Sequence, residues 1–253
     1  MNQQTQNMFQ NPQLDGSTLY HPGGKEIGIL LIHGFTATTI EVRCLADYFI
    51  QKDYTVFAPL LPGHGTTPMD LNTRNYSEWT KCVDDAYKKL HQRCKKVIVG
   101  GESMGAVLTL FLASKYPSIK AIYLFSPALL VKKLKFACLM RFINPLMDKN
   151  QPEDGLAWQG YTVYPTSAAY QFYKLARSLR KSLRKVSSPA LIFQGKFDKS
   201  IDTNNGEYIY NNIQSRIKQK IWLEFSGHVM LLDQEINVII DKIDEFNQLI
   251  QIS

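Results

Sequence analysis

The 253-residue chain is predicted to form an α/β protein with a mainly parallel, doubly wound sheet, helices on both faces and an inserted, mostly helical cap. Two observations lead to this prediction. Short apolar runs of strand-forming residues alternate with helical patterns along most of the chain, an order typical of parallel βαβ units. One stretch of about sixty residues interrupts the alternation, and it is too long for a crossover and too apolar for a linker.

The predicted strands are continuous apolar runs, as expected when both faces of a sheet are buried. They span residues 28–34, 55–61, 96–101, 121–127, 190–195 and 220–226. The predicted helices have apolar residues at helical spacing and span 39–51, 76–93, 104–116, 204–213 and 234–250. This pattern divides the chain into three parts. Residues 1–24 form a polar N-terminal tail that we expect to be frayed. The core domain consists of residues 25–127 and 189–253, and the cap subdomain, residues 128–188, is inserted between them.

Composition excludes several classes of protein. The longest apolar runs, such as Ile27 to Ile32, are far shorter than the roughly 18 residues that a membrane-spanning helix needs. The chain begins without the basic and apolar regions of a secretory signal, so we expect a cytoplasmic location. The net charge of +7 is spread along the chain rather than gathered in one arm, which argues against nucleic acid as a partner.

One segment, residues 174–185, carries the largest local excess of positive charge. The apolar residues in and just before it fall on one helical face and leave a basic outer face; they are Phe172, Leu175, Ala176, Leu179 and Leu183. We interpret the outer face as a solvated surface, with weak contact to anionic lipid interfaces as the alternative.

Metal and cofactor motifs are absent from the sequence. The cysteines form no C-x-x-C pair and have no histidines at zinc-finger spacing, so we expect isolated buried thiols at Cys44, Cys82, Cys94 and Cys138. The sequence contains neither the G-x-x-x-x-G-K-[ST] pattern for nucleotide phosphates nor the H-E-x-x-H pattern for zinc. We therefore predict no cofactor and no metal.

Ser103 lies in the pentapeptide Gly101-Glu102-Ser103-Met104-Gly105, between a predicted strand and a predicted helix. That order is the context of a nucleophile elbow, in which a sharp, strained turn lifts the serine Oγ above the sheet edge. Glycine on either side removes Cβ atoms that would collide with neighbouring backbone. Ser103 is therefore predicted to be a nucleophile, whereas Glu102 has no catalytic role that the sequence supports.

A serine nucleophile needs a base, and the base needs a carboxylate that fixes its tautomer. His228 follows the last predicted strand, and the loop after the preceding strand offers Asp198 and Asp202. We assign Asp198 as the acid because it lies at the mouth of its strand; Asp202, the alternative, is better placed to cap the next helix. The order Ser103, Asp198, His228 is that of α/β-hydrolase triads.

An acyl-transfer site also needs N–H donors for the oxyanion. We predict that these are the backbone N–H groups of Phe35, after an early strand, and Met104, after the serine. Gly34 lets the chain turn before Phe35, and His33 is expected to make a structural hydrogen bond.

Five motifs resemble the bacterial carboxylesterase and monoacylglycerol lipase group of α/β-hydrolases from about Gly28 to Phe246: GILLIHGFTAT, LLPGHGTTP, GGESMGAVLTL, PALIFQGKFD and SGHVMLLDQE. The resemblance implies an α/β-hydrolase fold, the same triad and oxyanion donors, and a small cap that shapes an apolar acyl tunnel. Monoglyceride lipases of this group hold the glycerol with an acidic cap residue. Gly155 stands at that position here, with Glu153 and Asp154 just upstream.

The cap sequence is rich in apolar residues that would suit an acyl chain. The candidates for substrate contact are Phe136, Leu139, Met140, Phe142, Ile143 and Leu146, with Met147 beside them; packing of the cap on the core domain is the alternative explanation.

The predicted function is a serine carboxylesterase for small to medium acyl esters, with monoacylglycerols among the candidates. Thioesters, or C–C bonds next to a carbonyl, are alternative substrates of the same machinery. A ligand-binding relative without turnover is the alternative from another class. The predicted partner is a small-molecule ester with an apolar acyl chain.

Overall fold

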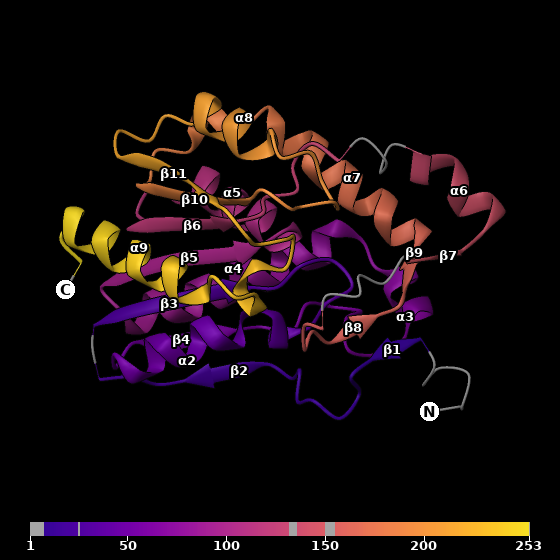
Figure 1. The fold of residues 1–253 in the computed structure, drawn as a ribbon, viewed down its shortest axis with the longest axis horizontal. Helices are drawn as coiled ribbons and strands as arrows, with labels where there is room; N and C mark the ends of the chain where they lie inside the picture. The colour runs from indigo at the N-terminus through magenta and orange to yellow at the C-terminus, as the bar shows by residue number, and fades with distance from the viewer. Residues whose placement is uncertain (1–7, 25, 132–135, 150–154, 253) are drawn as a thin grey trace.

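The computed structural model of the chain describes residues 8–24, 26–131, 136–149 and 155–252. Within these residues a central seven-stranded sheet has the strand order β11-β10-β6-β5-β3-β4-β2 (Figure 1). Strand β2 runs antiparallel to β4 at one edge, and the other six strands are parallel. The strands are β2 (Leu19–His21), β3 (Ile27–Ile32), β4 (Thr55–Ala58), β5 (Lys96–Glu102), β6 (Ala121–Phe125), β10 (Ala190–Gly195) and β11 (Lys218–Leu223).

Helices cover both faces of this sheet (Figure 1). Helices α4, α5 and α8 pack on one face of the sheet and α2 and α9 on the other, and each face has its own hydrophobic core. Side chains alternate along a strand, so Leu30 of β3 points into the core under α4, α5 and α8, and Leu31 into the core under α2 and α9. Strands β3, β5, β6 and β10 are buried along nearly their whole length, which explains their continuous apolar runs. The prediction that the last strand is also buried on both faces is wrong, because β11 is an edge strand in which only Leu223 is buried. The helices are α2 (Arg43–Gln51), α4 (Tyr76–Arg93), α5 (Met104–Lys115), α8 (Asn205–Asn212) and α9 (Ile236–Leu249).

The predicted doubly wound fold is therefore confirmed, and every predicted strand and helix of the core has an observed counterpart whose ends differ by a few residues. The predicted helix 39–51 begins with a 3₁₀ turn, η1 (Thr39–Val42), before α2.

The N-terminal segment differs from the frayed tail that the sequence predicted for residues 1–24. Residues 19–21 form β2, and β1 (Phe9–Gln10) pairs with β8 (Gly160–Tyr161) from the cap. Tyr20 of β2 packs edge to face against Phe57 of β4. Such short, half-exposed edge strands have no continuous apolar run, which is why the sequence pattern missed them. Residues 1–7 of the predicted tail lie outside the described residues.

The chain between β6 and β10 corresponds to the predicted cap, 128–188. Helix α7 packs against α3, α4 and α5, and the predicted apolar face of the basic segment is buried there: Phe172, Leu175, Ala176, Leu179 and Leu183. The cap thus shares the core of the main domain through α7. Its described elements are α6 (Ala137–Ile143), β7 (Leu146–Asp148), β8, β9 (Val163–Pro165), α7 (Thr166–Arg180) and η3 (Leu183–Lys185).

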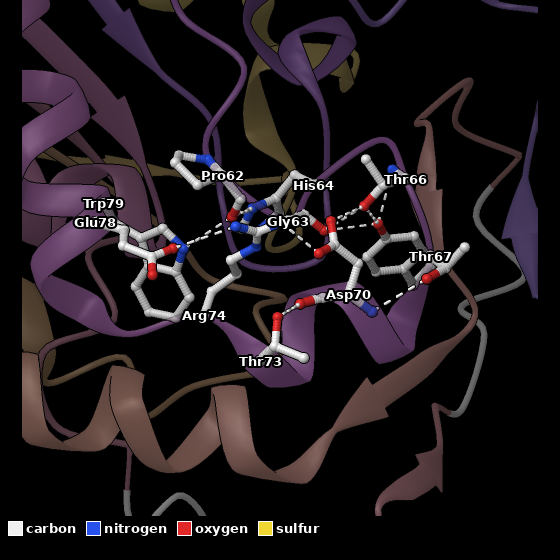
Figure 2. A network of polar contacts seen from close by, with 11 residues as sticks. Pro62, Gly63, His64, Thr66, Thr67, Asp70, Thr73, Arg74, Glu78 and Trp79 are labelled. Carbon is white, nitrogen blue, oxygen red and sulfur yellow. Dashed lines mark hydrogen bonds and ion pairs between the residues drawn. The ribbon is translucent and has the colours of Figure 1, made fainter.

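The loop after β4 connects the cap to the main domain (Figure 2). This loop leads into α3 (Pro68–Thr73), a short helix absent from the sequence prediction, in which Asp70 pairs with Arg74 just beyond its end. Tyr161 of β8 donates a hydrogen bond from its hydroxyl to the backbone oxygen of Gly63 over 2.7 Å. These contacts fix the position of β8 relative to the central sheet.

Candidate active site

Ser103 occupies the sharp turn between β5 and α5. Its backbone φ of 56° and ψ of −110° lie in a region that residues with a side chain rarely adopt, so the turn is strained as the sequence predicted. A Cβ at Gly101 would lie 2.3 Å from the backbone carbon of Gly105, and a Cβ at Gly105 would lie 2.0 Å from Ile32 O. Only glycine therefore fits on either side of the serine.

His228 lies within hydrogen-bond reach of both predicted partners. Its Nε2 is 2.9 Å from the Ser103 Oγ, and its Nδ1 is 2.7 Å from Asp198 Oδ2. Since an ionised carboxylate can only accept, Nδ1 carries the proton and Nε2 presents its lone pair to the serine hydroxyl. The three side chains thus form a continuous hydrogen-bonded row that can withdraw a proton from the serine.

The carboxylate of Asp198 is held from two sides. Its Oδ1 accepts the N–H groups of Ser200 and Ile201 at 2.9 and 3.1 Å, which leaves Oδ2 for His228. Burial would raise the pKa of Asp198, but the adjacent imidazole and these hydrogen bonds outweigh burial and lower it. Asp202 instead accepts the N–H of Asn204, two residues further along the loop. The N-cap of α8 is Asn204, so the expectation that Asp202 caps this helix is wrong.

The oxyanion loop, residues 33–35, follows β3 and lies against the serine. A Cβ at Gly34 would be 3.3 Å from the Ser103 Cβ. His33 is fully buried, accepts the Leu61 N–H at Nε2 (3.1 Å) and donates from Nδ1 to Gly34 O (2.9 Å). Burial lowers the pKa of His33 to about 4, so this ring is neutral and structural.

The predicted oxyanion donors flank Ser103. Met104 is the first residue of α5, where a backbone N–H has no acceptor within its own helix. Phe35 belongs to the oxyanion loop, and its ring packs against the rings of Trp79 and Phe172. Met104 directly follows the serine, and Phe35 directly follows Gly34, which lies against the serine. That their N–H groups stabilise a negatively charged tetrahedral oxygen stays a prediction.

Comparison with known proteins identifies the family. Residues 25–166, more than half of the chain, match the family described as "Serine aminopeptidase, S33". The chain belongs to this family of α/β-hydrolases. The hydrolase is 32% identical over 244 residues to the thermostable monoacylglycerol lipase of Bacillus sp. (strain H-257), covering 94% of this chain and 96% of that protein. It is 29% identical to the carboxylesterase of Bacillus subtilis (strain 168), covering 88% and 93%.

Solved structures agree with the predicted fold of the hydrolase. A structure reported for the metagenome-derived lipolytic enzymes LipS and LipT superimposes with a TM-score of 0.88 at 32% identity, covering 93% of this chain and 98% of that one. The monoacylglycerol lipase of Paleococcus ferrophilus superimposes with a TM-score of 0.76 at 16% identity, with the same coverage, and supports the fold alone. The resemblance stated from the five motifs is confirmed.

The predicted substrate residues of the hydrolase gather on and around α6. Phe136, Leu139, Phe142 and Ile143 are 61 to 76% exposed, and Met140 and Leu146 are half-buried. Packing of the cap on the core domain therefore does not account for the four exposed side chains. Gly155 adopts a φ of 68° with open space at its Cα, and the nearby Glu153 and Asp154 lie outside the described residues.

Other predictions concern metals, cysteines and membranes. Among the described residues, no group of three or more His, Cys, Asp or Glu side chains could hold a metal ion. All four cysteines are free. The prediction that they are buried is confirmed for Cys94 alone: Cys82 is half-buried, and Cys44 and Cys138 are exposed on helical surfaces. No helix in the described part of the chain is both long and apolar enough to cross a bilayer.

Sequence reasoning missed two residues beside the site. Glu41 contacts the oxyanion loop, and Glu102, which received no role, lies fully buried next to the serine. The available signal was a glutamate within an otherwise apolar and glycine-rich turn, where charged residues are rarely buried without a partner.

Proposed function

We propose that the protein is a serine carboxylic-ester hydrolase that acts on small to medium acyl esters, monoacylglycerols included, with Ser103 as nucleophile. The observation that carries the proposal is the row from Ser103 Oγ to His228 to Asp198, at 2.9 and 2.7 Å. The relatives named as monoacylglycerol lipase and carboxylesterase, which align over most of the chain, support the choice of an ester substrate.

In the first half of the reaction, His228 Nε2 takes the hydroxyl proton while Ser103 Oγ forms a bond to the carbonyl carbon of the ester. The carbonyl oxygen becomes an oxyanion and accepts hydrogen bonds from the N–H groups of Phe35 and Met104. Asp198, beside Nδ1, stabilises the imidazolium that results. The C–O bond then breaks, and the imidazolium gives its proton to the leaving alcohol, which leaves an acyl group on the serine.

In the second half, a water molecule replaces the alcohol. His228 takes one proton from the water, whose oxygen attacks the acyl carbon and forms a second oxyanion in the same place. Collapse of this intermediate breaks the bond to Ser103, which recovers its proton from His228. The products are the free acid and a regenerated enzyme, so no cofactor enters the balance.

The test is turnover of p-nitrophenyl esters from C2 to C16 and of monoacylglycerols by wild type and Ser103→Ala. We expect the variant to lose at least about a thousandfold in kcat. Ser114→Ala, on the same helix but with its hydroxyl bonded to Phe111 O, is the matched control and should keep full activity. Absence of wild-type turnover, or most of the activity remaining in Ser103→Ala, would refute the proposal.

The cap is proposed to bring the enzyme into weak contact with lipid interfaces. Helix α6 carries the exposed side chains of Phe142 and Ile143, 76 and 67% exposed, and it packs against α7. The outer face of α7 bears the exposed cations Lys174 and Arg177. Apolar side chains next to cations are the combination that binds anionic lipid surfaces.

The interface proposal has its own test. The double variant Phe142→Ser/Ile143→Ser should lose activity on monoacylglycerol in anionic vesicles and keep it on soluble p-nitrophenyl acetate. Leu249→Ser, which changes an exposed leucine (54%) of α9, is the matched control. Raised salt should weaken wild-type activity on these vesicles because it screens the cations. Equal activity of all three proteins on vesicles, or a flat salt response, would contradict the proposal.

A further inference from the structure

Two buried glutamates lie behind the proposed catalytic row and take no part in the mechanism above. Glu41 comes from η1, just after the oxyanion loop, and is 5% exposed. Glu102 is the last residue of β5, directly before Ser103, and is fully buried. Buried carboxyl groups are costly unless they are paired, hydrogen-bonded or protonated, so their presence here calls for an explanation.

Glu41 holds the oxyanion loop. Its Oε2 accepts the Gly34 N–H over 2.5 Å, while the Gly34 carbonyl oxygen accepts a hydrogen bond from His33 Nδ1 at 2.9 Å. That carbonyl belongs to the same planar peptide unit as the Phe35 N–H. The two contacts therefore fix the peptide planes on both sides of Gly34 and, with them, the direction in which the Phe35 N–H points.

Glu102 reaches in the opposite direction. Its Oε1 accepts the N–H of Leu231, in the short helix η4 (Met230–Leu232) that follows His228 closely in the chain, over 3.3 Å. Its Oε2 has no hydrogen-bond partner among the residues that the structure describes. The side chain thus links the serine turn to the loop that carries His228, with one buried oxygen left over.

The surroundings of Glu102 oppose a negative charge. Burial raises its pKa well above the ordinary value, and the nearby carboxyl groups of Glu41 and Asp198 raise it further. Burial also raises the pKa of Glu41, although the Gly34 N–H and the neighbouring His228 and Lys149 act against this. One oxygen of Glu102 receives no hydrogen bond in the described structure, burial and two nearby carboxyl groups oppose its charge, and only backbone N–H groups act against them; the balance favours the neutral carboxyl.

We propose that Glu41 and an uncharged Glu102 are positioning residues, which hold the oxyanion loop and the His228 loop against the serine turn. This inference rests on the proposed function of Ser103. Loss of Glu41 would free the Gly34 peptide and misdirect the Phe35 N–H, whereas loss of the Glu102 oxygen would release the Leu231 N–H. Both side chains are buried and out of reach of a substrate, so kcat should change more than KM.

The test for Glu41 uses Glu41→Ala and Glu41→Gln. With p-nitrophenyl butyrate, Glu41→Ala should lower kcat about tenfold or more and change KM less than about threefold, because transition-state geometry and not binding is disturbed. Glu41→Gln keeps an oxygen that can accept the Gly34 N–H and should recover most of the rate. Unchanged kcat in Glu41→Ala, or equal losses in both variants, would overturn the role of Glu41.

The test for Glu102 is the pH dependence of thermal unfolding. A protonated native carboxyl makes the folded state hold a proton that the unfolded chain releases above pH 4.5, so wild-type stability falls as pH rises. Glutamine does not titrate. The Tm of Glu102→Gln relative to wild type should therefore rise between pH 5 and 7, by about 3 to 5 °C per pH unit.

Asp84→Asn is the matched control for this measurement, because Asp84 is also buried but its pKa is lowered to about 2 despite burial, by hydrogen bonds from Lys115 and Lys88. Its Tm difference from wild type should stay constant from pH 5 to 7. A constant or falling Tm difference for Glu102→Gln over the same range would show that Glu102 is ionised and would overturn that part of the proposal.

A second readout separates this proposal from the proposed function. The rate at which a fluorophosphonate probe labels Ser103 depends on the oxyanion donors but on no particular ester. It should be slowed by Glu41→Ala and by Glu102→Leu and kept within about threefold of wild type by Glu102→Gln. Absent ester turnover with this labelling pattern would refute the proposed function alone. Wild-type labelling rates in Glu41→Ala and Glu102→Leu would refute the positioning roles alone.

Discussion

Replacement of Asp198 by asparagine tests the proposed chemistry most sharply, because the structure determines which way the new amide must face. The Oδ1 position accepts two backbone N–H groups, from Ser200 and Ile201. An amide NH₂ cannot accept, so the asparagine oxygen will take this position and its NH₂ group will face His228. The Gln194 side chain, 3.4 Å from Oδ2, can turn its unpartnered Oε1 toward this NH₂ group.

The amide then forces the wrong tautomer on the histidine. An NH₂ group next to Nδ1 requires Nδ1 to accept, which moves the imidazole proton to Nε2, 2.9 Å from Ser103 Oγ. The serine has no base in that state. We expect Asp198→Asn to lower kcat about 10⁴-fold, as the same change does in other serine hydrolases, which corresponds to about 5 kcal/mol of transition-state stabilisation.

The assay is kcat for p-nitrophenyl butyrate at pH 7.5, with thermal unfolding to verify that the variant is folded. Asp202→Asn provides the matched control, since Asp202 lies in the same loop but bonds the N–H of Asn204. It should stay within about threefold of wild type. If Asp198→Asn keeps more than a tenth of wild-type kcat, or if Asp202→Asn falls as far, the assignment of Asp198 is refuted.

Three further predictions concern stability. Gly105→Ala should destabilise the protein by about 3 kcal/mol in urea unfolding, because its Cβ would lie 2.0 Å from Ile32 O; wild-type stability would contradict the proposed close packing. Tyr161→Phe should cost about 1 to 3 kcal/mol and lower the Tm, since it leaves the Thr66 N–H (2.9 Å) without its acceptor. Asp84→Asn should be less stable than wild type at pH 7, and about 2 kcal/mol of this difference should disappear as pH falls from 5 to 2. The unfolded chain takes up a proton at Asp84 near the ordinary pKa of 3.8, but the folded protein does so only near the lowered pKa of about 2, so the stabilisation by this carboxylate is lost as pH falls through that range. A stability difference independent of pH would refute this reasoning.

The core strands and the order of the site residues could be predicted from the sequence for a physical reason. Strands buried on both faces must be apolar throughout, and the ligands of a parallel sheet lie at the carboxyl ends of its strands. Ser103 and Asp198 follow two such strands, β5 and β10, and His228 follows β11, a half-buried parallel strand at the sheet edge, so chain order alone suggested that they meet. The distances of 2.9 and 2.7 Å agree with that expectation.

The missed elements depend on partners far away in the chain. Strands β1, β7, β8 and β9 are two or three residues long and exist because of their pairing, which no local pattern encodes. The apolar side chains of α6 illustrate a different limit, since helical spacing identifies an apolar face but not whether protein covers it. Phe142 is 76% exposed, although it lies in a helix with Leu139, Met140 and Ile143.

Glu41 and Glu102 could not be given roles from the sequence because their contacts are with backbone groups. Their partners are the backbone N–H groups of Gly34 and Leu231. Every non-proline residue has such a group, so no residue type in the sequence marks the partner. Only the three-dimensional arrangement reveals that both acceptors are buried beside the serine.

The pairing of β1 with β8 has a consequence for the order of folding. Asn11, next to β1, donates a side-chain hydrogen bond to the backbone oxygen of Trp158, a residue 147 positions further along the chain. During synthesis the chain emerges from its N-terminus, so this first strand has no partner until the cap has been made. We expect β1 to dock last, after the central sheet and α7 have formed, and its docking to be the step that joins the beginning of the chain to the finished cap.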